Sequence, residues 1–384
     1  MTRSQLLALL SLLPLLLATG SAPQGSLRQA AAAAGLLVGT AVRPYALSEA
    51  AYSETLGREF NMVEPEDAMK WWTVRRNEGA FDFHQGDQIV RFARAHDMKV
   101  RGHCLVWDHD NPKWLSAAKF TPQQLAHVLQ EHIATEMKHY AGQVFAWDVV
   151  NEAFDERGRL KDSIWFNQPG IGFSGEGTAY IEQAFRWARD ADPGAVLFYN
   201  EAEAEGMNPK SDAVYAMIKD FKQRGVPIDG VGLQLHISRL DFDADPLAKN
   251  IARLSALGVQ VHITELDVSL PLDATRAIRS DDLQHQADIY RNVLHACLQN
   301  PGCTAVQTWG FTDKYSWIGS TLMVPEVGRC CLTRAISQSP PTPPCSKSFL
   351  PKQCAGINTS SILAVEPAWF AGRRMQRPPI SSHL

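Results

Sequence analysis

The chain has 384 residues, of which 45% are hydrophobic and 20% charged, with a formal net charge of −4 and a pI near 6.3. This composition excludes a disordered or fibrous protein and is sufficient for one large globular domain or two medium ones. Because the chain carries no basic excess, nucleic acid is not the expected partner.

The first 22 residues have the layout of a secretory signal peptide, with Arg3 before an apolar run and small residues after it. Pro14 interrupts this run, which is too short to predict a membrane span. We therefore expect cleavage of residues 1–22 and a secreted or periplasmic protein with no membrane attachment. The alanine-rich residues 23–34 are interpreted as a linker to the first strand.

From residue 35 onwards, short β-rich runs alternate with longer stretches of helical period. The helices carry clear signals: Thr121, Pro122 and Gln124 predict a capped start, and Gly225 predicts the end of a later helix. Eight runs that are apolar on both faces predict an α/β fold, a (β/α)8 or TIM barrel. An open doubly wound sheet is the alternative, but no Gly-rich phosphate loop follows the first run. The runs cover residues 35–42, 58–66, 98–107, 143–152, 196–201, 230–237, 259–268 and 304–311.

Two groups of side chains lie outside these strand ends. Cys297 and Cys303 are close together in a chain that is expected to be exported, so they are the best candidates for a disulfide. His132, Glu136 and His139 share one helical face. With no further ligand in view, we interpret them as a solvated face and not as a metal site.

The strand-like runs end in polar side chains, and a TIM barrel places its active site at those ends. A single buried polar group is more often a satisfied structural residue. Six or seven strands that all end this way predict a polar cleft with aromatic walls. The set comprises Glu66, Asp67, Lys70, His103, Trp107, Asp108, Asn151, Glu152, Asn200, Glu201, Gln234, His236, Glu265, Asp267, Trp309 and Asp313.

Two of these residues, Glu152 on the fourth run and Glu265 on the seventh, would face each other across the barrel mouth. Double displacement at a glycosidic carbon needs two carboxyl groups roughly 5 to 5.5 Å apart. We expect Glu265 to be the nucleophile and Glu152 the acid/base, its proton retained by the negative charge of Glu265. Asn151 is expected to bind the sugar 2-hydroxyl, and His236, fixed by Asp267, to orient Glu265.

In these residues the sequence resembles glycoside hydrolase family 10, the endo-β-1,4-xylanase family. The motifs EPEDAMKW, RGHCLVW, WDVVNEAF, GLQLHI, VHITELDV and TWGFTDKYSW follow the family's order over residues 35–318. The resemblance implies retaining hydrolysis of xylan or a related β-1,4-linked polysaccharide by a monomer, with Glu152 as acid/base, Glu265 as nucleophile and no metal or organic cofactor. Asp67 and Asp108 replace the usual Asn and His, which leaves chain-length and side-chain preference open. The implied sugar contacts are Glu66, Asp67, Lys70, His103, Trp107, Asn151, Gln234, His236, Trp309 and Trp317.

The last 66 residues, 319–384, differ in character from the rest and carry nine of the 22 Pro and four of the seven Cys. The resemblance predicts a barrel-closing helix here, and the sequence reads instead as coil. The segment is a disordered appendage, a small disulfide module or the product of a shifted reading frame. We favour the last, because an appendage should follow the final helix and not replace it.

Two functions therefore stay open. The first is an active secreted retaining endo-xylanase, with cleavage of cellulose as a variant. The second is a non-catalytic or poorly folded product that at most binds xylan, because an abnormal C-terminal segment would leave apolar flanks of the barrel uncovered.

Overall fold

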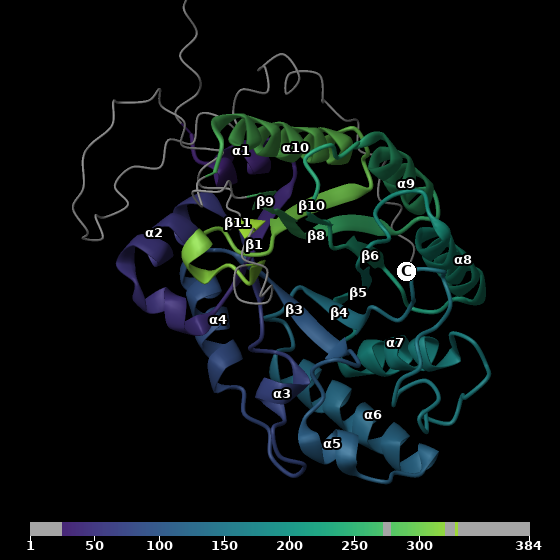
Figure 1. Cartoon of the computed structure of the whole chain (residues 1–384). Coiled ribbons are helices and arrows are strands. Elements are labelled where there is room, and N and C mark those ends of the chain that lie inside the picture. The colour runs from purple at the N-terminus through teal and green to yellow at the C-terminus, as the bar shows by residue number, and fades with distance from the viewer. Residues whose placement is uncertain (1–24, 272–277, 319–326, 329–384) are drawn as a thin grey trace, which may run out of the picture.

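A closed barrel of eight parallel strands forms the centre of the molecule (Figure 1). The computed structural model describes residues 25–271, 278–318 and 327–328. Strand β10 pairs with both β8 and β1, which closes the barrel and confirms the predicted fold class. In barrel order the strands are β1 (Leu37–Val42), β2 (Met62–Pro65), β3 (Lys99–Val106), β4 (Ala146–Asn151), β5 (Val196–Glu201), β6 (Gly230–Leu233), β8 (Gln260–Val268) and β10 (Cys303–Thr308).

Helices surround the barrel on its outer side (Figure 1). Their local signals agree with the sequence: Thr121 and Gln124 form a capping box at the start of α6, and Gly225 ends α8 in the left-handed conformation. The longer helices are α2 (Ala50–Glu59), α4 (His84–Ala95), α6 (Pro122–His139), α7 (Ala179–Ala191), α8 (Pro209–Arg224), α9 (Asp245–Ser255) and α10 (Ser280–Leu298). The short elements are η1 (Pro44–Ser48), α3 (Trp71–Val74), α5 (Lys113–Ala117), β7 (His236–Ile237), η2 (Asp313–Tyr315) and the antiparallel pair β9 (Leu270–Pro271) and β11 (Val327–Gly328).

The main core lies between the strands and the helices. Leu129 and Ile133 of α6, Phe185 of α7 and Phe221 of α8 are fully buried there. Burial of one such side chain contributes about 1.5 to 3 kcal/mol, so the outer ring of helices holds the barrel in shape. The strands are buried along almost their whole length, as strands covered on both faces must be.

The segment predicted as a linker contains a helix, α1 (Leu27–Ala33), so the prediction is wrong for those residues. Ser26 and Gln29 form a capping box at its start, and the backbone N–H of Leu27 donates to the Glu59 carboxylate at 2.8 Å. Leu27 and Ala31 are buried against the core. The spacing of Ser26 and Gln29 in the sequence is that of a capping box, but the alanine-rich composition favoured a linker.

The helical face with His132 and Glu136 is not solvated, which corrects the prediction. Both side chains are fully buried, and the His132 ring stacks on Trp71 with the ring centres 3.5 Å apart. Its Nε2 lies 3.2 Å from Glu136 Oε2. Trp71, in the segment after β2, covers this face of α6. His139, partly exposed, pairs instead with Asp87.

Cys297 and Cys303 form the predicted disulfide, with their Cα atoms 5.2 Å apart. The predicted signal peptide, residues 1–22, lies outside the described residues, and so does almost all of the C-terminal segment 319–384. Over the described part of the chain, every helix is too short or too polar to span a membrane.

Candidate active site

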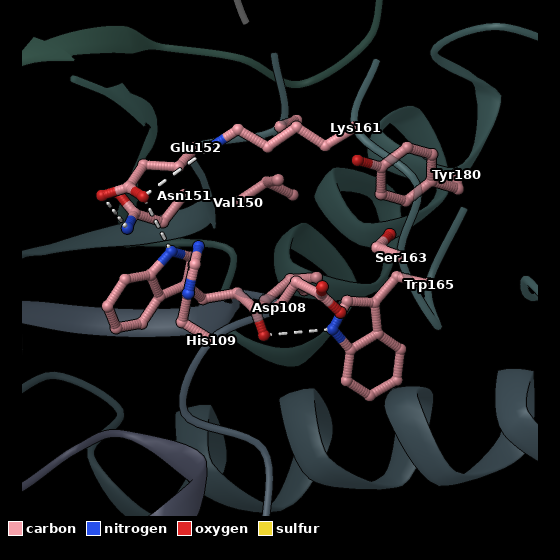
Figure 2. A pocket seen from close by; sticks show the side chains of 12 residues that line it. Asp108, His109, Val150, Asn151, Glu152, Lys161, Ser163, Trp165 and Tyr180 are labelled. Atoms are coloured by element: carbon pink, nitrogen blue, oxygen red, sulfur yellow. Dashed lines mark hydrogen bonds and ion pairs between the residues drawn. The ribbon is translucent and has the colours of Figure 1, made fainter. Parts of the chain in front are cut away.

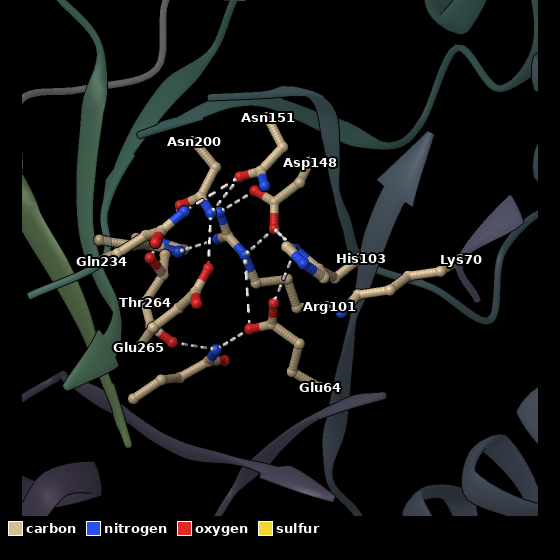
Figure 3. Close-up of polar contacts among 12 residues, drawn as sticks. Glu64, Lys70, Arg101, His103, Asp148, Asn151, Asn200, Gln234, Thr264 and Glu265 are labelled. Atoms are coloured by element: carbon tan, nitrogen blue, oxygen red, sulfur yellow. Dashed lines mark hydrogen bonds and ion pairs between the residues drawn. The ribbon is translucent and has the colours of Figure 1, made fainter. Parts of the chain in front are cut away.

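The site lies at the carboxyl ends of the barrel strands, and Figure 3 shows polar contacts made by five of the predicted residues: His103, Asn151, Asn200, Gln234 and Glu265. Asn151 ends β4 and Glu152 follows it, while Glu265 lies on β8. The parallel order of the strands brings these ends to one face of the barrel. The predicted residues that share contacts there are Asp67, Lys70, His103, Trp107, Asn151, Glu152, Asn200, Gln234, His236, Glu265, Asp267, Trp309 and Trp317.

Three amide side chains bridge the two predicted catalytic carboxylates. The Gln234 amide donates to Glu152 Oε1 at 2.9 Å and to Asn151 Oδ1 at 3.2 Å. Asn200 Nδ2 donates at 2.8 Å both to that Asn151 oxygen and to Glu265 Oε1. The two carboxylates therefore belong to one hydrogen-bonded assembly with fixed orientations.

His236 is held between two carboxylates. Its Nε2 lies 3.1 Å from Glu265 Oε2, and its Nδ1 lies 3.0 Å from Asp267 Oδ2. Trp317 Nε1 donates to the same Asp267 oxygen at 2.7 Å. Burial alone would lower the pKa of His236, but Asp267 and Glu265 outweigh it and raise that pKa well above the usual value. The imidazolium therefore faces Glu265 near neutral pH.

The surroundings of Glu152 differ from the expectation. Trp107 Nε1 donates to Glu152 Oε2 at 3.1 Å, and Lys161 Nζ lies 4.0 Å from that oxygen. Burial raises the pKa of Glu152, but the Gln234 amide, Lys161 and Trp107 together lower it below the usual value. The charge of Glu265, which we expected to keep Glu152 protonated, is outweighed by these nearer groups.

A buried ionic network lies beneath the site (Figure 3). Arg101 donates to both Asp148 oxygens, from Nε at 3.1 Å, and its Nη1 lies 2.8 Å from His262 Nδ1. His103 Nδ1 lies 3.0 Å from Asp148 Oδ2. Burial raises the pKa of Asp148, but Arg101 and His103 lower it overall. Asp148 therefore anchors the ring of His103, whose position the family resemblance assigns to sugar binding.

Three groups of this network, Glu64, His103 and Glu265, each offer one ligand atom within 4.8 Å of the others. Arg101 Nε lies 3.8 Å from Glu64, and Gln307 Nε2 donates to the same carboxyl. Burial, with Asp148 nearby, raises the pKa of Glu64 well above the usual value. A protonated Glu64 beside a guanidinium suits an internal polar network better than a divalent cation, which needs ionised carboxylates.

Aromatic rings and Lys70 form the wall of the cleft. Lys70 Nζ lies 4.9 Å from the centre of the Trp107 ring and 5.8 Å from that of Trp309. The same ammonium lies 3.2 Å from Asp67 and 3.7 Å from Asp110. Asp67, which departs from the family pattern, thus holds the one cation of this wall that is expected to contact sugar hydroxyls.

Glu66 is buried, and both its carboxylate oxygens accept hydrogen bonds from Arg43, one of them from Nε at 2.8 Å. Burial raises the pKa of Glu66 and Arg43 opposes that shift, with a net rise. Arg43 follows β1 and was not among the predicted residues. Its position just beyond a strand end was the available signal.

A pocket opens beside Glu152 (Figure 2). Its lining includes Trp107, His109, Lys161 and Tyr180. Lys161 and His109 were missed from the sequence, because both lie in loops whose course the strand pattern does not define.

The site combines two linked carboxylates, a histidine on one of them and an aromatic wall at the mouth of a (β/α)8 barrel. This combination is typical of the glycoside hydrolases. Within that class, residues 26–333 match the model of glycosyl hydrolase family 10, so the chain belongs to this family.

Known relatives agree with this assignment. Endo-1,4-beta-xylanase B of Thermotoga neapolitana is 41% identical over 267 residues, which cover 70% of this chain and 74% of that protein. Endo-1,4-beta-xylanase C of Phanerodontia chrysosporium is 38% identical over 294 residues, 76% of this chain and 71% of that protein. The crystal structure of xylanase 10B from Thermotoga petrophila in complex with xylobiose superposes with a TM-score of 0.75 at 38% identity, covering 82% of this chain and 93% of that one.

Proposed function

We propose that this family 10 glycoside hydrolase is a secreted, retaining endo-1,4-β-xylanase. The observation that carries the proposal is the bridge of Gln234, Asn151 and Asn200 between Glu152 and Glu265. Retention is implied by membership of family 10, and the anomer of the first product tests it. The xylobiose bound by the Thermotoga petrophila relative supports xylan as the substrate.

In the first step, Glu265 attacks the anomeric carbon of the sugar. The carboxylate is oriented by Asn200 on one oxygen and by His236 on the other. The C–O bond to the leaving sugar breaks as Glu152 gives its proton to the glycosidic oxygen, so a covalent glycosyl-enzyme forms. The leaving sugar occupies the pocket beside Lys161 and Tyr180.

For this step Glu152 needs a proton, although its neighbours hold its pKa below the usual value. A bound sugar chain displaces water from the cleft, and burial raises the pKa of a carboxyl group. The glycosidic oxygen then accepts the proton directly. In the second step Glu152, now a carboxylate, takes a proton from the water that attacks the anomeric carbon and releases Glu265.

The test is release of reducing sugar from xylan and from cellulose by the purified full-length chain. We expect release from xylan, and a loss of at least about 10⁴-fold in Glu265→Gln, because the amide keeps the shape and removes the nucleophile. Glu54→Gln on α2 is the matched control, since this glutamate is exposed on the outside of the barrel. Proton NMR of the first product should show the β-anomer.

The competing proposals give different results. Preferential release from cellulose would replace xylan by a glucan as the substrate. An α-anomer as first product would exclude retention. No release from either polymer by a folded chain, with binding to xylan intact, would establish the non-catalytic alternative. Recovery of the protein from the medium of an exporting host, cut near residue 22, would support secretion.

A further inference from the structure

Glu152 has an unusual backbone conformation. Its φ is 55°, in the left-handed region that a side chain with a Cβ rarely adopts. Such a conformation persists only where the surrounding structure enforces it. The direction of the Glu152 side chain depends on this φ, so whatever holds the backbone also aims the carboxyl group.

The backbone N–H groups of Glu152 and of the two residues after it all donate to acceptors on strand β5. The N–H of Glu152 donates to the Asn200 carbonyl at 3.0 Å. The N–H of Ala153 donates to the Tyr199 hydroxyl at 3.1 Å, and that of Phe154 donates to Glu201 Oε2 at 3.2 Å. Two of these three acceptors are side chains, so they can be removed by substitution.

Tyr199 and Glu201 lie outside the substrate cleft. Their neighbour Asn200 points to Glu265 inside the barrel, and side chains alternate along a strand, so they point to the outer face. Both are fully buried. The Tyr199 hydroxyl donates to Glu201, and Lys210 Nζ lies 3.4 Å from the other Glu201 oxygen. No sugar can contact this pair.

We infer that Tyr199 and Glu201 are positioning residues that hold the segment after Glu152 and thereby aim the acid/base at the glycosidic oxygen. The inference rests on the proposed role of Glu152. Burial raises the pKa of Glu201 to about 7, against the opposing effects of Lys210 and Tyr199. Its ability to accept from Phe154 and Tyr199 together is greatest when it is ionised.

A purely structural role for the pair makes a different prediction, because general acid catalysis depends on the leaving group. A sugar hydroxyl leaves slowly without a proton, whereas 2,4-dinitrophenolate leaves readily without one. A misaimed acid therefore slows cleavage of xylotetraose and leaves glycosylation by 2,4-dinitrophenyl β-xylobioside almost unchanged. Loss of folded protein reduces both rates by the same factor.

The experiment compares kcat/KM for these two substrates in the full-length chain. Tyr199→Phe removes the acceptor of the Ala153 N–H, and Glu201→Gln removes the negative charge and one of the two acceptor oxygens, both at nearly constant size. Tyr140→Phe is the matched control, because Tyr140 is buried and its hydroxyl donates to a single backbone carbonyl, that of Phe83, at 3.3 Å. Glu152→Ala gives the full effect of losing the acid. Thermal unfolding of each variant defines the fraction folded.

We expect Tyr199→Phe and Glu201→Gln to lower kcat/KM for xylotetraose about 10-fold, which is part of the 10² to 10⁴-fold typical of general acid catalysis. For the dinitrophenyl substrate, we expect kcat/KM to fall less than twofold. Two results would overturn the inference and leave the role of Glu152 intact, provided that Glu152→Ala shows the dependence on the leaving group. One is an equal loss of kcat/KM on both substrates, and the other is no loss in either variant. If Glu152→Ala itself slows both substrates equally, the role of Glu152 fails, and the inference fails with it.

Discussion

Removal of the positive charge next to Glu152 should extend activity to higher pH. Lys161 Nζ lies 4.0 Å from Glu152 Oε2, and two unit charges at this distance interact by about 4 kcal/mol at an effective dielectric constant near 20. The Lys161 side chain is 35% exposed, so solvent screening reduces this to about 1 kcal/mol. Since one pKa unit corresponds to about 1.4 kcal/mol, Lys161→Gln should raise the pKa of Glu152 by roughly 0.5 to 1 unit.

The sign follows from the role of Glu152 as the acid. Activity falls as pH rises through the pKa of Glu152, so a higher pKa moves this decline to higher pH. The assay is the pH profile of kcat/KM on xylotetraose, which reports groups of the free enzyme. Lys219→Gln on the exposed side of α8 is the control for a change in net charge.

Salt provides a second check, because the difference between wild type and Lys161→Gln should shrink at 1 M ionic strength, where the screening length is about 3 Å. An alkaline limb that stays in place, or that moves to lower pH, would refute the reasoning. The same result in Lys219→Gln as in Lys161→Gln would show that net charge, and not proximity to Glu152, causes the shift.

Three further predictions concern stability. Burial raises the pKa of Glu136 well above its usual value and lowers the pKa of His132 well below its usual value. The contribution of Glu136 to stability is therefore lost as pH rises above about 4.5. The contribution of His132 is lost as pH falls below about 6.5. Between pH 5.5 and 7.5, the free energy of unfolding measured in urea should therefore fall by up to about 1.4 kcal/mol per pH unit more for the wild type than for Glu136→Gln. Parallel pH dependences of the two proteins would contradict this. Arg101→Met leaves buried carboxylates without their cation and should destabilise by about 3 to 5 kcal/mol in urea titration, with an unchanged midpoint as the opposing result. Replacing Cys297 and Cys303 by Ser opens a loop with a sequence separation of 6, so the loss should be at most about 2 kcal/mol in calorimetry, and a larger loss would indicate packing by the sulfur atoms.

Strand positions were predictable because a strand that is covered on both faces has a continuous run of apolar residues. All eight predicted runs contain a barrel strand. The same logic located Glu152 and Glu265 at the barrel mouth, but it was wrong for Glu201, whose side chain points to the outer face of the barrel and contacts Tyr199 and Lys210. The residues that interrupt the apolar pattern are therefore the ones that sequence alone identifies.

Partners across the barrel were not predictable. Arg43 and Arg101 act through contacts with residues 23 and 47 positions away in the chain, and a linear pattern does not encode which strand end meets which loop. The buried His132 shows the same limit, because its helix reads as polar on the face that Trp71 covers. The low pKa of Glu152 depends on the sum of several such contacts, so no single residue signals it.

The way in which the barrel closes determines when the chain can fold. Strand β1 pairs with β10, and Thr308 donates a hydrogen bond to Thr40, 268 residues earlier. At a synthesis rate of about 5 to 20 residues per second, roughly 15 to 50 seconds separate the emergence of these two residues from the ribosome. During that interval the growing sheet exposes two unpaired edges, which are sites of intermolecular strand pairing. The yield of native protein should therefore depend on chaperones that bind the nascent chain more than on the stability of the finished barrel.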